Sequence, residues 1–292
     1  MPQGSPPRPE VIRDPEEARR RVLAARAAGK RSAVVPTMGA LHEGHLSLVA
    51  AANADCQFTA VTIFVNPTQF APHEDLTKYP RQLEADLELL ARHAVDFVFV
   101  PTPESMYPEG FSTYVQPPAV GSLWEGASRP EHFRGVTTVV LKLFNILPTD
   151  TAIFGQKDFQ QAAVIEHMVR DLNVPVEIQV APIVRDADGL ALSSRNVYLS
   201  AEERRRALGL SRALRKVKEL VDAGERDAAA LNQAMSQTLA DYGIDRIDYA
   251  VVVDRHTLEP LTTLERSAVA LIAAHAGSTR LIDNQLLEPR TE

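Results

Sequence analysis

Residues 32–184 alternate between short apolar runs and segments with helical periodicity, and this alternation constrains the fold more than any other feature. Apolar runs suited to buried strands occur at 32–36, 58–65, 95–100, 151–154 and 176–184. Helical segments fit between them near 44–54, 80–93, 133–147 and 158–171. Such alternation indicates βαβ units and a mostly parallel sheet covered on both faces. The predicted fold class is therefore α/β, with a Rossmann-like sheet.

The C-terminal part of the chain has a different pattern. Ser200 and Glu203 form a capping box that begins a helix, and a second helix fits 226–241. Three strand candidates follow, at 248–254, 268–274 and 279–283. Short loops join them, so we predict antiparallel pairing in a smaller α+β domain. The expected division is a Pro-rich disordered tail over 1–10, a Rossmann-like domain over 11–186 and an α+β domain over 187–292.

Composition excludes several classes of protein. A net charge of −7 over 292 residues argues against a large nucleic-acid footprint. The single cysteine, Cys56, excludes an intrachain disulfide framework and fits a reducing compartment. No apolar stretch is long enough to span a bilayer, and the N-terminus lacks the apolar core of a secretory signal. We expect a cytoplasmic protein with neither a membrane nor a nucleic-acid partner.

The segment 32–45 predicts a phosphate site. It reads as a strand, a glycine-containing turn, and two histidines at the start of a helix. Gly39 and Gly44 allow close approach of the backbone to a ligand, and the helix N-terminus favours an anion. His42 and His45 add two donors whose charge can be tuned. A zinc site is the weaker interpretation, because the histidines lie three residues apart rather than in the H-E-x-x-H pattern.

Two more segments follow strand candidates, where ligands of parallel sheets bind. In 66–70, Gln69 offers an amide that can donate and accept, although a solvated glutamine is the favoured interpretation of this segment alone. In 155–161, Lys157 supplies a compact cation for a phosphate. Asp158 is placed to cap the next helix, and Gln161 shares roughly one helical face with it.

A third polar segment lies at the expected domain boundary. Ser193, Ser194 and Arg195 form a compact donor set for phosphate oxygens in an otherwise apolar context. A polar interdomain loop is a plausible interpretation of residues 186–189, but it fits residues 192–196 less well.

Taken together, these segments resemble the pantothenate synthetase family. The motifs, in the order in which the family has them, are P-T-M-G-A-L-H-E-G-H (36–45), F-V-N-P-T-Q-F (64–70), Y-P-R (79–81), R-P-E-H-F-R-G-V-T-T-V-V-L-K-L-F-N (129–145), G-Q-K-D-F-Q-Q (155–161) and L-S-S-R-N (192–196). The resemblance covers about residues 12–285. More distantly, the chain is similar to adenylate-forming nucleotidyltransferases with an aminoacyl-tRNA-synthetase-like core.

The resemblance implies an AMP-forming ligase that joins (R)-pantoate to β-alanine using ATP, through an enzyme-bound pantoyl adenylate. Pantoate, β-alanine and ATP are the expected partners, with Mg²⁺ mainly on the ATP phosphates and no organic cofactor. Family members are homodimers, so a homodimer is expected. We further expect the C-terminal domain to close over the site as a lid, with residues 193–195 as the contact between domains.

The resemblance also assigns site residues. Those assigned to ATP are Met38, Gly39, Ala40, Leu41, His42, Glu43, Gly44, His45, Gly155, Gln156, Lys157, Asp158, Val184, Leu192, Ser193, Ser194 and Arg195. Expected catalytic residues among them are His45, His42, Lys157 and Arg195. Gln69 and Gln161 are assigned to pantoate, with Gln69 also near β-alanine, and Asp86 is a candidate ligand for Mg²⁺.

Some positions depart from the commonest family pattern. The loop 71–73 is idiosyncratic, Leu192 stands where methionine is more usual, and Gln156 replaces a frequent glutamate. None of these changes removes a group that the chemistry requires. Two rival functions remain, another adenylating enzyme and a non-catalytic nucleotide sensor, and a sensor would be expected to have lost Lys157 or a histidine.

Overall fold

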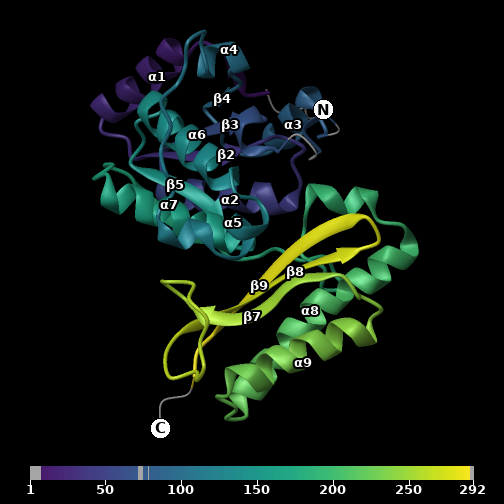
Figure 1. Cartoon of the computed structure of the whole chain (residues 1–292). Coiled ribbons are helices and arrows are strands. Elements are labelled where there is room, and N and C mark those ends of the chain that lie inside the picture. The colour runs from purple at the N-terminus through teal and green to yellow at the C-terminus, as the bar shows by residue number, and fades with distance from the viewer. Residues whose placement is uncertain (1–7, 72–74, 78, 290–292) are drawn as a thin grey trace.

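The computed structural model describes residues 8–71, 75–77 and 79–289, and it confirms the α/β fold class. A six-stranded parallel sheet has the order β1-β4-β3-β2-β5-β6, and a separate antiparallel sheet has the order β7-β8-β9 (Figure 1). The strands are β1 (Glu10–Ile12), β2 (Ser32–Thr37), β3 (Phe58–Ile63), β4 (Phe97–Phe99), β5 (Thr151–Gly155), β6 (Glu177–Ala181), β7 (Ile247–Asp254), β8 (Ala268–Ala276) and β9 (Thr279–Leu287).

Helices cover both faces of the parallel sheet. The helices of this half are α1 (Pro15–Ala27), α2 (Glu43–Asp55), α3 (Leu83–Leu90), α4 (Pro103–Met106), α5 (Trp124–Ser128), α6 (His132–Ile146) and α7 (Phe159–Asp171). The C-terminal half contains α8 (Ala201–Asp222) and α9 (Ala228–Asp241), which pack on the antiparallel sheet. Successive residues of β2 point to opposite faces, so Val34 joins the core under α1, α6 and α7. Ala33 and Val35 join the core under α2 and α3. This burial on both faces explains why the strands are apolar throughout.

The order of the strands predicts where a ligand would bind to the parallel sheet. The chain leaves β2 towards β3 on one side, whereas β5 lies against the other side of β2 and continues to β6. The loops that follow β2 and β5 therefore leave the same edge of the sheet in opposite directions. Ligands of open α/β sheets bind at such a topological switch point. The histidine segment follows β2, and the Lys157 segment follows β5.

The antiparallel sheet lies between the two C-terminal helices and the first half of the molecule (Figure 1). Alternate residues of β8, such as Ala270 and Ile272, pack under α8 and α9. The intervening residues Val269 and Leu271 belong to the same core as the parallel sheet. Because both of its faces are covered, all nine residues of β8 are buried.

Some boundaries differ from the sequence prediction. Residues 1–7 of the expected tail lie outside the described residues, and Glu10, its last residue, begins β1. The run predicted as a strand over 176–184 ends at Ala181, because Pro182 cannot donate to a ladder. Of the idiosyncratic loop 71–73, residues 72 and 73 also lie outside the described part of the chain.

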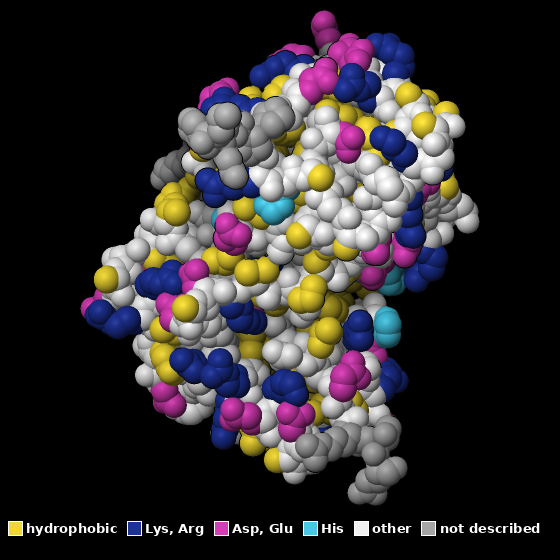
Figure 2. All heavy atoms as spheres, turned by 180° about the vertical axis from the view of Figure 1, so that it is seen from behind, with side chains coloured by type: hydrophobic (Ala, Val, Ile, Leu, Met, Phe, Trp, Pro, Cys, Tyr) yellow, Lys and Arg dark blue, Asp and Glu magenta, His cyan; other side chains and the backbone are white. Residues whose placement is uncertain are grey.

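The surface seen from behind the molecule mixes both signs of charge. Among the described residues on this face, Lys and Arg side chains are interspersed with Asp and Glu over both halves (Figure 2). Within the described ranges, no helix combines the length and apolarity needed to cross a membrane.

Candidate active site

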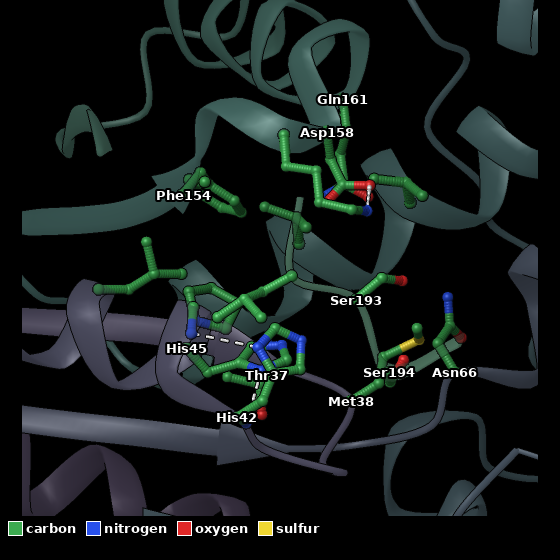
Figure 3. A pocket seen from close by; sticks show the side chains of 18 of the residues that line it. Thr37, Met38, His42, His45, Asn66, Phe154, Asp158, Gln161, Ser193 and Ser194 are labelled. Atoms are coloured by element: carbon green, nitrogen blue, oxygen red, sulfur yellow. Dashed lines mark hydrogen bonds and ion pairs between the residues drawn. The ribbon is translucent and has the colours of Figure 1, made fainter. Parts of the chain in front are cut away.

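A cavity opens at the switch point of the parallel sheet. It is lined from the β2 side by Met38, His42 and His45, and from the β5 side by Lys157 and Gln161. The loop 192–195 closes it from the side of the C-terminal half. Figure 3 shows His42 and His45 opposite Asp158 and Gln161, with Ser193 between them. The three segments predicted from sequence to bind phosphate therefore do converge.

The two histidines cap α2 reciprocally. The Nδ1 atom of His42 accepts the backbone N–H of Gly44 at 3.1 Å, and the Nδ1 atom of His45 accepts the backbone N–H of His42 at 3.3 Å. Because each Nδ1 accepts a hydrogen bond, a neutral ring carries its proton on Nε2. A Cβ atom on Gly44 would lie 2.8 Å from Cε1 of His42, so only glycine allows this ring position.

Both rings are neutral at physiological pH. Burial, followed by the charge of Lys157, lowers the pKa of His42 to about 4. Burial also lowers the pKa of His45 to about 3, with His42 and Lys157 contributing. The ring centroids are 4.2 Å apart, so two charged rings would repel each other. The pair therefore presents two uncharged N–H donors rather than two cations.

Two positively charged side chains, those of Lys157 and Arg195, line the cavity. The Lys157 side chain is only 21% exposed, and its Nζ lies 3.9 Å from Oδ1 of Asp158. The hydroxyl of Ser193 accepts the backbone N–H of Arg195 at 3.2 Å, which begins a short 3₁₀ turn and holds the donors of this loop together. Two cations with several neutral donors suit a ligand with multiple phosphate oxygens.

Gln69 is buried, which corrects the interpretation of this loop glutamine as solvated. Its Oε1 accepts from Nδ2 of Asn66 at 3.0 Å, so its Nε2 must face the other way, where it donates to Sδ of Met38 at 3.2 Å. Asn66 also donates to the carbonyl of Gly135 at 3.2 Å. A side chain at position 135 would meet the backbone oxygen of Thr68 at 2.4 Å, so α6 can approach this loop only through a glycine.

The apolar wall of the cavity was missed in the sequence analysis. Val136, Val139, Val140 and Leu143 of α6 line one side, and the wall is extended by Phe64, directly after β3, and by Phe154, near the end of β5. Their spacing along α6 is that of a core-facing helical stripe. That stripe was the available signal, but it does not distinguish a buried core from the wall of a binding site.

Several residues that were predicted to bind ATP or Mg²⁺ do not line the cavity. Gly39, Ala40, Leu41, Glu43 and Gln156 are absent from the lining. Asp86, the candidate for Mg²⁺, is 1% exposed, and its carboxylate accepts the backbone N–H groups of Ala40 at 3.0 Å and Leu41 at 2.8 Å. Burial raises the pKa of Asp86, while these two hydrogen bonds oppose that shift. Asp86 therefore holds the turn before His42 and does not reach the cavity.

A larger cleft of about 980 Å³ adjoins the cavity and separates the two halves. The two hollows share five lining residues, Lys157, Asp158, Gln161, Ser193 and Arg195, so they lie side by side. The cleft is walled on the other side by β8 and β9, including Arg280 and Asn284.

Comparisons with known proteins gave relatives that match most of the chain. A family model described as pantoate-beta-alanine ligase matches residues 10–286. A protein named pantothenate synthetase from Moorella thermoacetica is 53% identical over 279 residues, covering 96% of this chain and 99% of its own length. One from Acidobacterium capsulatum is 56% identical over 253 residues, covering 87% of this chain and 85% of its own length.

Solved structures give the same result. The crystal structure of pantothenate synthetase from Thermus thermophilus is 44% identical, with a TM-score of 0.89, and covers 96% of this chain and 100% of its own. That of pantoate-beta-alanine ligase from Francisella tularensis is 32% identical, with a TM-score of 0.76, and covers 95% and 97%. The latter was solved in complex with beta-gamma ATP and beta-alanine.

Proposed function

Because this chain belongs to the pantoate–β-alanine ligase family, a family of ligases that form a carbon–nitrogen bond, we propose that it works in two steps through an enzyme-bound pantoyl adenylate. One observation carries the proposal. A single cavity brings two cations and two neutral imidazole donors to within reach of two glutamine amides and an apolar wall. Polyphosphate and a small branched hydroxy acid are the ligands that suit these two kinds of surface.

In the first step, a carboxylate oxygen of pantoate attacks the α-phosphorus of ATP. The bond from that phosphorus to the oxygen bridging to the β-phosphate breaks, and pyrophosphate leaves with the electron pair. The protein supplies no nucleophile, so catalysis consists of positioning and of stabilising the charge that builds on the phosphates. Lys157 and Arg195 provide positive charge, and the Nε2–H groups of His42 and His45 provide donors that need no proton exchange with solvent.

Pantoate is oriented by the rest of the cavity. Its two methyl groups fit the apolar wall of α6, and its hydroxyls and carboxylate need the mixed donors and acceptors of Gln69 and Gln161. The Gln69 amide is already held by Asn66 and Met38 in one orientation. Little side-chain entropy is then lost when pantoate binds.

In the second step, the amine of β-alanine attacks the acyl carbon of the adenylate. The bond from that carbon to the phosphate oxygen breaks, AMP leaves, and the nitrogen loses a proton. Water must be kept out during this step, because the adenylate would otherwise hydrolyse. In this proposal the C-terminal half, residues 187–292, acts as the lid, with the loop 193–195 as its contact to the nucleotide.

Mg²⁺ is part of the proposal as a companion of the ATP phosphates. Among the described residues, no group of three or more His, Cys, Asp or Glu side chains could hold a metal ion. Mg²⁺ tends to keep several waters and to bind largely through substrate phosphates. Asp158, which lines the cavity next to Lys157, replaces Asp86 as the candidate carboxylate for such an ion.

The test is pyrophosphate–ATP exchange with pantoate, run without and with β-alanine. Exchange that requires pantoate but not β-alanine, followed by AMP and pantothenate when β-alanine is added, supports the adenylate route. Exchange with a different acid, and not with pantoate, would support the adenylate route but refute pantoate as the substrate. ATP binding without exchange for any acid would favour a nucleotide sensor.

A further inference from the structure

Asn284 of β9 holds the loop that carries Lys157, although the two residues come from different halves of the molecule. Its Nδ2 donates to the backbone carbonyl of Gln156 at 2.8 Å and to that of Lys157 at 3.0 Å. Its Oδ1 accepts from Nε2 of Gln156 at 3.1 Å. Carbonyl oxygens can only accept, so these contacts fix which end of the Asn284 amide faces the loop.

Asn284 is itself immobilised. It is 2% exposed, and its backbone N–H donates to Oδ1 of Asp283 at 2.8 Å. The Asp283 carboxylate forms a bidentate ion pair with Arg185 at 2.6 and 2.9 Å. Arg185 immediately precedes the loop that joins the two halves, so the amide of Asn284 is tied both to the second sheet and to this junction.

These contacts hold the backbone on both sides of the Lys157 side chain. The two carbonyls belong to consecutive peptide units, and Lys157 lies at their junction. With both carbonyls fixed, the backbone of Lys157 cannot rotate, and the side chain is aimed from a rigid base into the cavity. A misplacement of about 1 Å in a catalytic group costs on the order of 10²-fold in rate.

We propose that Asn284 is a positioning residue for Lys157, which makes the C-terminal half a structural part of the phosphate site and not only its cover. The proposal rests on the function proposed above, in which Lys157 stabilises phosphate charge. It also gives Gln156, which does not line the cavity, a role: its side chain completes the link to Asn284.

The test is a double-mutant cycle between positions 284 and 157. Asn284→Asp keeps the size of the side chain but removes both N–H donors, and Asn284→Ala removes the amide without adding charge. Asn232→Asp is the matched control, because the side-chain oxygen of Asn232, in the same half, accepts the backbone N–H of Val252 at 2.8 Å, a contact that aspartate keeps. Thermal melts identify variants that have lost the fold.

We expect either Asn284 variant to lower kcat for pantoate-dependent exchange about 10- to 100-fold. The KM for pantoate should stay within about twofold, and Asn232→Asp should behave as wild type. In a Lys157→Ala background the same change should cost less than about threefold, because its effect passes through Lys157. An equal loss in both backgrounds, or a folded Asn284 variant with normal kcat, would overturn the proposal.

ATP affinity measured by calorimetry keeps this test separate from the choice of acid. Asn284→Asp should weaken ATP binding when Lys157 is present and have little effect in Lys157→Ala. A wild-type protein that fails to exchange with pantoate would refute the proposed function, whereas the affinity cycle would still decide the role of Asn284. If Asn284→Asp weakened ATP binding equally with and without Lys157, Asn284 would have no positioning role for Lys157.

Discussion

At the scale of single residues, the chemistry of the site depends on where protons reside. His42 and His45 each use Nδ1 to accept a backbone N–H, and their pKa values are lowered to about 4 and about 3. Under the proposed function, both rings enter the reaction as neutral Nε2–H donors. Such donors would stabilise phosphate charge without an ionisable switch near pH 7.

Nitrogen NMR of histidine-labelled free protein tests the tautomers. At pH 7 the signals of His42 and His45, assigned with single His→Asn variants, should show protonated Nε2 and unprotonated Nδ1. Because both folded pKa values lie below the usual 6.5, neither ring should titrate until the pH falls below about 5. Titration of either ring near pH 6.5 would contradict the assignment.

Lys157 and Gln161 should fail in different ways when they are truncated. Lys157→Ala removes a cation from the phosphate site and should lower turnover on the order of 10²–10³-fold. Gln161→Ala should mainly raise the KM for pantoate, since its amide is assigned to that substrate. Steady-state kinetics with each substrate varied would separate the two. Near-normal turnover in Lys157→Ala, or an effect of Gln161→Ala confined to ATP, would refute the respective role.

At the scale of elements, α2 shows how one residue can serve both folding and chemistry. His42 is the N-cap of α2 and also a cavity donor. Asparagine is among the best N-caps, whereas alanine is a poor one. The two roles can therefore be separated by substitution.

His42→Asn should retain the stability of the protein, and His42→Ala should lower the free energy of unfolding by about 1 kcal/mol. Both should lose activity to a similar extent, because neither keeps the Nε2–H donor. Denaturant unfolding and exchange kinetics on the same samples check this. If His42→Asn recovered activity together with stability, the role of His42 would be confined to the cap.

The elements that were predicted from sequence are those with strong local patterns. Long apolar runs such as 58–63 and the capping box at Ser200 are visible without knowledge of their neighbours. The edge strand β1 was missed because it has three residues, of which only Ile12 is buried, and it depends on a partner far along the chain. The donors of the site lie in local motifs and were predicted. The apolar wall and Asn284 depend on which elements meet in space, which no local pattern contains.

At the scale of the whole molecule, the two halves are joined by a buried ion pair. Glu125 of α5 accepts two hydrogen bonds from Arg280 of β9, at 2.8 and 2.9 Å, and Arg280 also binds Asp248 at 2.6 Å. Tyr249 donates to Glu125 at 3.1 Å. The side chains of Glu125 and Arg280 are 10% and 25% exposed, so this pair is largely, although not fully, shielded from solvent. Although burial raises the pKa of Glu125, the hydrogen bonds and charge of Arg280 hold it below its usual value.

Glu125→Gln should lower the free energy of unfolding at pH 7 by about 3 kcal/mol, the lower end for a broken buried pair, because Arg280 keeps Asp248. A carboxylate with a depressed folded pKa contributes stability above its unfolded pKa, here 4.5, and loses it as the pH falls through the folded value. The difference between variant and wild type should therefore shrink below pH 4.5.

The exposed pair of Glu177 with Arg31 provides the control. The side chains are 58% and 45% exposed, so Glu177→Gln should cost less than about 1 kcal/mol. Denaturant unfolding at pH 7 and at pH 4 would measure both variants. A cost for Glu125→Gln as small as that of the control would show that this contact does not hold the halves together.

The pairing of β1 also has a consequence for how the chain is made. Glu10–Ile12 lies at the edge of the parallel sheet, in register with Phe97–Phe99 of β4. Residues 10–12 therefore cannot pair with β4 until residues 97–99 have been synthesised. Contacts between residues so far apart in sequence form slowly, because the loop between them must close first. Residues 10–12 should be among the last segments of the sheet to acquire protection from hydrogen exchange during folding.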